Sequence, residues 1–150
     1  MAAIKENLKM TGELDIVLMD ANGNIKDSRK VHNLVVDDGL DFITSRMVGA
    51  TPGIMSHMGV GSDNTAAAAG DTTITQLGSR AALTSDNKAA NVVTYIATFG
   101  AGVGTGAVVE AGLFNSATVG DMLCRTVFAV VNKAADDIMT INWAITLTAV

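Results

Sequence analysis

Two histidines and one cysteine are the residues in this chain best suited to metal binding or nucleophilic catalysis. His32, His57 and Cys124 lie far apart in the sequence, without the short spacings of metal-binding or thiol motifs. His57 and Cys124 each lie in an apolar run, where an inert packed side chain is the simpler interpretation. The sequence therefore indicates no catalytic site, no metal site and no cofactor, and we expect a non-enzymatic protein.

A glutamate and an arginine provide the next candidate for chemistry. Glu110 and Arg125 lie in two successive runs that read as neighbouring strands. Their offset suits an ion pair across the two strands, which more often fixes register or serves an interface than performs acid–base catalysis. We predict a structural ion pair.

An acidic and amide-rich segment begins like a calcium-binding loop. Asp20, Asn22 and Asn24 alternate, but Ile25 stands where that loop needs glycine and Val31 where it needs the bidentate glutamate. The Asn-Gly step within the segment favours a β-hairpin turn instead. We predict a hairpin of two strands around residues 20–24.

Three aspartates precede and begin the one segment with helical periodicity, which we place at about residues 39–48. Asp37 or Asp38 is expected to cap this helix, because carboxylates accept hydrogen bonds from the free amides of the first turn. Leu40, Ile43 and Met47 fall on one helical face, and Phe42 and Arg46 lie to one side of it.

Four glycines between residues 100 and 106 do not form a phosphate-binding motif. Their spacing differs from G-x-G-x-x-G, and no helix follows to supply the free amides that hold a phosphate. A mobile loop or a bulged hairpin connection is expected there.

Strands must position the side chains discussed above, and the C-terminal segment gives the clearest strand pattern. Its odd positions, from Met139 through Ile141 and Trp143 to Leu147, are apolar, whereas its even positions are rich in threonine. This period of two predicts a half-buried strand with Trp143 on the core face. The other runs raise the count to about eight strands with short links, which predicts an all-β antiparallel β-sandwich or jelly roll with one short helix.

Length and composition limit the classes of protein further. The 150 residues suit a single domain, with residues 1–10 as an N-terminal arm and residues 11–150 as the β-sandwich. The net charge is −5 without a large basic cluster, which disfavours nucleic-acid binding. We find neither a membrane-spanning run nor a secretory signal, and a single cysteine excludes an internal disulfide.

Several motifs resemble those of a known group of virion proteins. They are NLVV at 33–36 with Gly39, MGVGS at 58–62, LGSR at 77–80, TYIATF at 94–99, GTG at 104–106, EAGLFN at 110–115, MLCRTVF at 122–128 and NK at 132–133 with DD at 136–137. Together the chain resembles tailed-bacteriophage structural proteins, and most of all the capsid decoration (cement) proteins of short-tailed phages.

This resemblance implies a protein made in the bacterial host cytoplasm and carried on the outer surface of the phage head. It would bind the major capsid protein and staple neighbouring capsomers, with self-association as a homodimer or trimer at the capsid symmetry axes. A tail-fibre, baseplate or other tail structural protein is the alternative. A small ligand-binding β-sandwich is a distant third, disfavoured by an aromatic content of 4%.

Three segments are the candidate partner surfaces, because long loops and terminal arms often carry contacts. They are the N-terminal arm, residues 62–76 and residues 100–106. The candidate interface residues are Lys5, Lys9, Asp63, Asn64, Thr65, Asp71, Thr72, Thr73, Gly102, Gly104 and Thr105.

Overall fold

The C-terminal strand β9 (Ile138–Ala149) lies in the interior of the sheet, between β1 (Leu8–Met19) and β6 (Val92–Phe99). A computed structural model describes residues 7–50 and 53–150. The side chains of Met139, Ile141 and Trp143 are each 0% exposed, whereas Asn142 is exposed. The predicted alternation of β9 and the burial of Trp143 are therefore confirmed.

All strand pairings in the described residues are antiparallel, and one short helix accompanies them, as the sequence predicted. Nine strands are present in this part of the chain instead of about eight, because a two-residue strand was not foreseen. The remaining elements are β2 (Ile25–His32), β3 (Leu34–Val35), α1 (Asp37–Met47), β4 (His57–Gly61), β5 (Ala81–Ala89), β7 (Gly106–Phe114) and β8 (Met122–Lys133).

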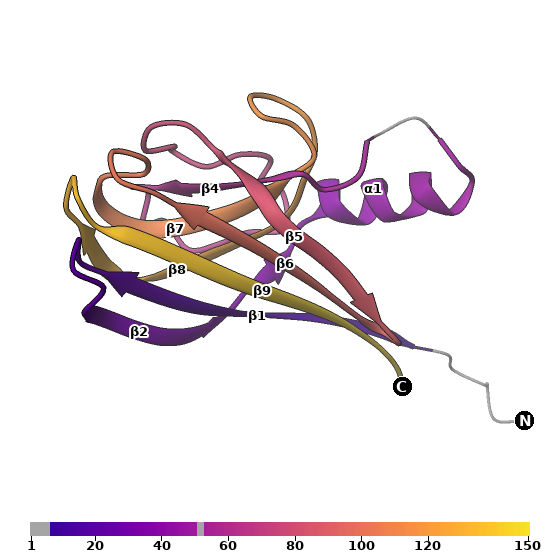
Figure 1. The fold of residues 1–150 in the computed structure, drawn as a ribbon. Helices are drawn as coiled ribbons and strands as arrows, with labels where there is room; N and C mark the ends of the chain where they lie inside the picture. The colour runs from indigo at the N-terminus through magenta and orange to yellow at the C-terminus, as the bar shows by residue number, and fades with distance from the viewer. Residues whose placement is uncertain (1–6, 51–52) are drawn as a thin grey trace, which may run out of the picture.

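The nine strands form one sheet in the order β2-β1-β9-β6-β5-β4-β7-β8-β3, which folds over so that two layers enclose the core (Figure 1). The sheet bends within β5. Ala81 and Ala82 pair with β4, whereas the rest of β5 pairs with β6 after a register shift between Leu83 and Ser85. Such a bulge bends a strand and increases its twist, which allows β5 to belong to both layers.

Polar contacts join the outer strand β2 to β8, the neighbour of the other outer strand β3, across the remaining gap. Arg29 of β2 donates from Nη1 to the carbonyl oxygen of Ala129 in β8 at 2.5 Å. The hydroxyl of Thr126 in β8 donates to the carbonyl oxygen of His32 at 2.7 Å. These bonds make the sheet nearly closed, so most strand edges are paired or covered.

The turn between β1 and β2 confirms the predicted hairpin. Gly23 has a φ of 84°, and one carboxylate oxygen of Asp20 accepts hydrogen bonds from the amides of Asn22 and Asn24, both at 2.9 Å. These bonds lower the pKa of Asp20, with the backbone of Asn24 as the largest cause. The carboxylate thus stabilises a turn.

The helix differs from its prediction in its start and in its cap. It begins at Asp37, its N-cap is Val36 without a side-chain cap bond, and the Asp38 carboxylate accepts from the amide of Met122 at 2.7 Å instead. A Cβ on Gly39 would lie 2.1 Å from the carbonyl oxygen of Leu123, so the helix backbone touches β8 directly at this glycine. That contact turns Gly39 and Phe42 inward.

The apolar face formed by Leu40, Ile43 and Met47 consequently turns outward in part. Leu40 is 48% exposed and Met47 is 80% exposed, while Ile43 is half-buried against the core. Helical periodicity identified this face correctly, but it did not show which neighbour approaches the helix most closely.

Two further boundaries also differ. Lys9 and Met10, assigned to the arm, lie in β1, where they pair with Thr148 and Leu147 of β9. From the sequence, residues 80–86 read as a strand, but β5 continues to Ala89 and the chain reverses at Ala90 and Asn91. Pairing with a neighbouring strand extended both segments beyond their own periodicity.

The two faces of β9 provide a direct test of this layout. Ile141→Ala should lower the free energy of unfolding by about 2–5 kcal/mol, because it leaves a cavity in a close-packed core. Asn142→Ala, one residue away on the exposed face, should change it by less than about 0.5 kcal/mol. Urea denaturation of both variants measures the difference, and equal effects would contradict the assignment of faces.

Candidate interaction surface

The predicted ion pair between Glu110 and Arg125 is present and buried. Glu110 of β7 lies opposite Val127 of β8, and Gly112 lies opposite Arg125, so the two charged side chains meet diagonally across adjacent strands. Arg125 donates from Nε to Oε2 of Glu110 at 2.9 Å. The side chains are 3% and 0% exposed, respectively.

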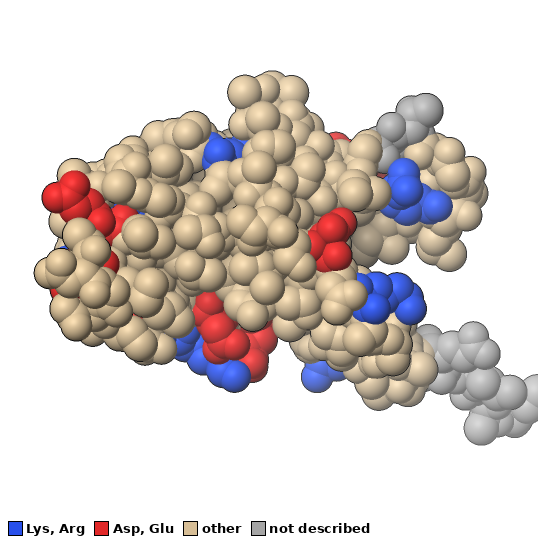
Figure 2. Space-filling model, in the orientation of Figure 1, with Lys and Arg blue, Asp and Glu red and all other residues tan. Residues whose placement is uncertain are grey.

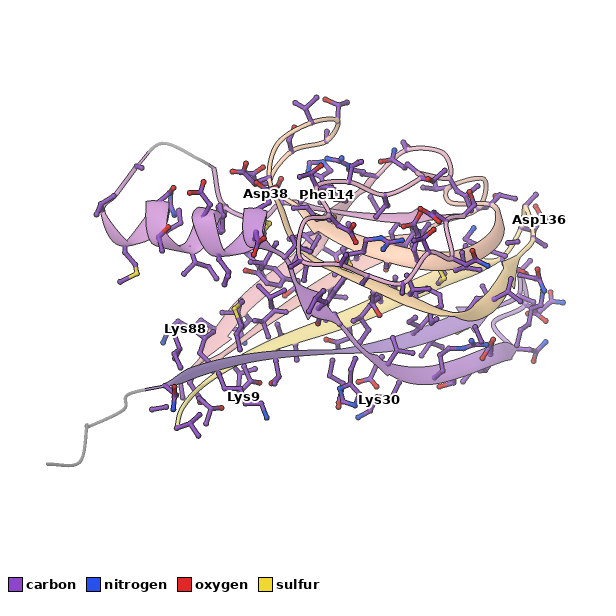
Figure 3. All side chains as sticks on the ribbon, turned by 180° about the vertical axis from the view of Figure 1, so that it is seen from behind. Lys9, Lys30, Asp38, Lys88, Phe114 and Asp136 are labelled. Carbon is purple, nitrogen blue, oxygen red and sulfur yellow. The ribbon has the colours of Figure 1, made fainter. Side chains whose placement is uncertain are left out.

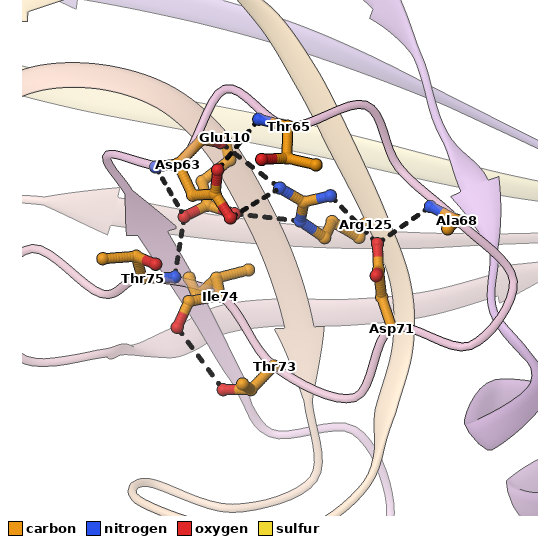
Figure 4. A network of polar contacts seen from close by, with 9 residues as sticks. All are labelled: Asp63, Thr65, Ala68, Asp71, Thr73, Ile74, Thr75, Glu110 and Arg125. Atoms are coloured by element: carbon orange, nitrogen blue, oxygen red, sulfur yellow. Dashed lines mark hydrogen bonds and ion pairs between the residues drawn. The ribbon is translucent and has the colours of Figure 1, made fainter.

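This pair holds the long loop of residues 62–76 against the sheet (Figure 4). The second carboxylate oxygen of Glu110 accepts from the backbone amides of Asp63 at 3.0 Å and Thr75 at 2.7 Å. Arg125 donates from Nη1 to the carboxylate of Asp71 at 2.9 Å and from Nη2 to the carbonyl oxygen of Asp63 at 3.2 Å. One buried cluster therefore binds the start, middle and end of the loop.

The electrostatics favour the charged state of this arginine. Burial lowers the pKa of Arg125, but hydrogen bonds and charges from Glu110 and Asp71 outweigh it and raise the pKa above its usual value. The backbone amide of Thr65 lowers the pKa of Asp63, with a smaller contribution from Arg125. Asp71 also accepts from the amide of Ala68 at 2.9 Å, so its carboxylate orders the loop while it faces the arginine.

A glycine allows the loop to approach this cluster. A Cβ on Gly61 would lie 2.3 Å from Oε1 of Glu110 and 2.4 Å from the carbonyl oxygen of Thr75. Both distances are far inside van der Waals contact. The absence of a side chain at Gly61 is therefore required for the carboxylate to reach the loop amides.

The candidate interface residues of this loop divide into two sets. Asn64, Thr65, Thr72 and Thr73 are exposed, so they are available to a partner. Asp63 and Asp71 are half-buried and lie against Arg125. Their carboxylates are thus partly used within the molecule, and their contact with a partner stays a prediction; the sequence alone did not connect them with the buried arginine, which requires neutralising groups.

The second candidate loop, residues 100–106, is held by a buried lysine. Lys133 is 2% exposed and donates from Nζ to the carbonyl oxygen of Gly100 at 2.9 Å, and Gly102 donates its amide to Ala135 at 2.7 Å. Burial lowers the pKa of Lys133, partly opposed by the charge of Asp137. Sequence reasoning missed Lys133, although it shares the inward phase of Val131 two residues earlier.

The residues of this loop differ in their exposure. Gly102 and Thr105 are exposed. Gly104 is buried with a φ of 67°, and a Cβ there would lie 2.7 Å from a methyl group of Val60. Gly104 thus packs under the loop, and its assignment to a partner surface stays a prediction. Lys9 is exposed in β1, and Lys5 lies outside the described residues.

Arg80 was not foreseen as a structural residue, and it supports a third loop at residues 115–121. Its guanidinium lies over the ring of Phe114, 3.4 Å from the ring centroid. It also donates from Nη1 to the carbonyl oxygens of Ser116 and Val119, both at 2.8 Å. The loop projects from the body of the molecule between β7 and β8 (Figure 1).

The residues with nucleophilic or metal-binding chemistry remain separate from these clusters. His57 is half-buried with Nδ1 at 2.8 Å from the hydroxyl of Ser56, and His32 is exposed. Cys124 is buried, and burial raises the pKa of its thiol well above the usual value, which disfavours the reactive thiolate. Within residues 7–50 and 53–150, no group of three metal-binding side chains gathers.

A shallow hollow of about 420 Å³ lies between the 62–76 loop, β8 and the start of β3. Ala66, Ala67 and Leu34 contribute to its lining, together with Arg125. No Phe, Tyr or Trp of the described residues lines it, so it lacks the large flat stacking surface expected of a carbohydrate site. In the same described part of the chain, no helix has the length and apolar character to span a bilayer.

Two glycine substitutions test the role of the buried cluster. Gly61→Ala should force the loop away from Glu110, lower the free energy of unfolding by roughly 1–3 kcal/mol, and expose residues 62–76 to proteases. Gly70→Ala is the matched control, since a Cβ there meets nothing within 4 Å. Limited proteolysis with mass spectrometry measures both, and equal cleavage of the two variants would contradict the proposed clamp.

Comparisons of the chain with protein-family models, curated proteins and solved structures found no match. They therefore assign no family. The interpretation as a phage virion protein therefore stays a prediction from the sequence motifs given above.

Proposed function

We propose that this protein is a bacteriophage capsid decoration protein that binds the outside of the major capsid protein shell and staples neighbouring capsomers. The motifs between residues 33 and 137 support the virion assignment by their resemblance to such proteins. The single structural observation that carries the proposal is the loop of residues 62–76, fixed to the sheet by Glu110 and Arg125.

A fixed loop suits a stapling protein for an energetic reason. Ordering a mobile, rotamer-rich side chain on binding costs about 0.5–1.5 kcal/mol, so a surface that is already ordered keeps more of its contact energy. The exposed side chains of Asn64, Thr65, Thr72 and Thr73 are short and offer hydrogen bonds. Exposed alanines between them allow close approach by a flat partner.

The distribution of charge agrees with a broad protein contact. Charged residues make up 17% of the chain, below the roughly 25% of typical domains. Figure 2 shows that Lys, Arg, Asp and Glu are sparse over the centre and top of one face and more frequent toward its margins. The fully buried centres of protein interfaces are likewise depleted in charge.

Each copy needs only modest affinity for this role. A shell offers many equivalent sites in symmetric arrangement, and a molecule that contacts two neighbouring capsomers gains from the high effective concentration of the second site. This role requires no enzymatic chemistry, and the ion pairs described above maintain the shape of the contact surface.

The proposal is tested by mixing the purified protein with phage heads that lack it and counting bound copies by quantitative mass spectrometry. We expect copies in near-stoichiometric ratio to the major capsid protein and heads that resist heat or osmotic shock better. Binding of only a few copies per particle would overturn the decoration role in favour of a tail component. Absence of binding would overturn both.

A substitution in the fixed loop locates the contact. Thr72→Arg should weaken head binding by roughly tenfold or more, because it introduces an unpaired charge and bulk into a close contact. Asn142→Arg places the same side chain on an exposed strand position and should bind normally. Equal affinity of the two variants would show that the 62–76 loop is not the contact surface.

A further inference from the structure

Strand β5 belongs to both layers only at its start, and the rest of the strand has a free edge. Ala81 and Ala82 pair with β4, whereas the segment from Ser85 to Ala89 pairs with β6 alone. No further strand in the described part of the chain pairs with the opposite edge of this segment. β5 and β6 extend past β4 toward the chain termini, so this edge follows the open margin of the sheet (Figure 1). Such an edge presents backbone amides and carbonyls with which another strand can pair.

The hairpin determines which backbone groups point to the free edge. β5 and β6 are joined by a two-residue turn, and the residues that flank it, Ala89 and Val92, are paired. In a hairpin of this kind the closing pair exchanges both backbone hydrogen bonds, and bonded and non-bonded pairs alternate from there. The backbone amide and carbonyl of Asn87 therefore point to β6, whereas those of Asp86 and Lys88 point to the free edge.

A hollow of about 230 Å³ lies beside this edge. Asp86 and Lys88 border it from β5, Val93 and Tyr95 border it from β6, and Ile54, which is 56% exposed, borders it from the segment before β4. Each of the two β5 residues is paired with one of the two β6 residues, so these four side chains share one face of the hairpin. A strand that paired with β5 would direct every second side chain toward this hollow.

Two opposite charges accompany the free edge. Asp86 and Lys88 are exposed and lie two positions apart on the same face of β5. Among residues 7–50 and 53–150, neither side chain takes part in an ion pair. Lys88 lies near the strand ends, at the margin of the sheet (Figure 3). Directly opposite side chains on adjacent strands lie about 5 Å apart, so an added strand with a basic residue opposite Asp86 and an acidic residue opposite Lys88 would pair both charges.

We propose that the free edge of β5 from Ser85 to Ala89 binds an extended segment of the major capsid protein as an additional β-strand, with a basic and an acidic residue of that segment facing Asp86 and Lys88. This inference rests on the proposed function, which supplies the partner. The edge itself indicates the form of the occupant, because an extended backbone matches amides and carbonyls at strand spacing, whereas a helix has its own backbone groups already bonded. Backbone hydrogen bonds supply affinity in this mode of binding, and the hollow and the two charges supply specificity.

The added strand gives a stapling protein its second contact. The 62–76 loop is fixed to β7 and β8 by Glu110 and Arg125, whereas the free edge belongs to β5. Two contacts on different strands of one rigid sheet suit a molecule that joins two neighbouring capsomers, because the second contact forms at a high effective concentration.

Proline substitution tests the added strand, measured as the affinity of the full chain for phage heads that lack it. Lys88→Pro removes an amide that points to the free edge and leaves the bonds to β6, and it should weaken head binding by roughly tenfold or more. Ser28→Pro is the matched control, because Ser28 of the outer strand β2 also directs its amide away from its only partner strand, and it should bind normally. Ile54→Glu should weaken binding similarly, whereas Ile25→Glu, at a residue 65% exposed, should not. Urea midpoints of all four variants should stay near that of the original chain.

Hydrogen exchange with mass spectrometry provides a readout that does not depend on substitution. Residues 85–89 should gain protection when the original chain is bound to heads, while residues 25–32 of β2 should not. If the original chain binds heads without this gain, or if Lys88→Pro and Ile54→Glu both bind as tightly as their controls, the added strand is overturned and the proposed function stands. If the original chain does not bind heads at all, both are overturned. Should Lys88→Pro alone shift the urea midpoint, Ile54→Glu and the exchange measurement decide the outcome.

Discussion

The buried pair of Glu110 and Arg125 is the interaction on which the rest of the surface depends. Charges that are removed from water destabilise a fold unless they are paired and every remaining donor and acceptor is satisfied. Here the neighbouring strands provide only one of the required hydrogen bonds, and the 62–76 loop provides the others through Asp63, Asp71 and Thr75. The loop is ordered because its amides and carboxylates complete the hydrogen bonding of the buried ion pair.

The same use of charge recurs at the neighbouring 100–106 loop. Lys133 binds the backbone of the 100–106 loop, and Asp137 accepts from Lys26 at 2.6 Å and from the amide of Ala134 at 2.8 Å. Several of the chain's few charged side chains thus hold loops in place. What remains on the outside of these loops is mainly alanine, threonine, glycine and asparagine, which is suited to shape-dependent contact with a protein.

Much of the strand arrangement could be predicted from local sequence patterns. The alternation in β9, the hairpin at Gly23 and the pairing of Glu110 with Arg125 were predicted, because strand periodicity and turn chemistry are local. The orientation of α1 was not predicted, because it depends on the contact between Gly39 and the backbone of Leu123, which are distant in sequence. The inward orientation of Asp71 also depends on a non-local partner.

The central claim is that the Glu110 carboxylate orders the loop, and amide hydrogen exchange tests it most directly. In the unmodified protein, the amides of Asp63 and Thr75 should exchange slowly, at rates closer to those of β7 than to those of exposed positions in the same loop. In Glu110→Gln, which keeps an oxygen acceptor but removes the charge that holds Arg125, both amides should exchange faster while those of β9 stay protected. Fast exchange at Asp63 and Thr75 in the unmodified protein would contradict the account.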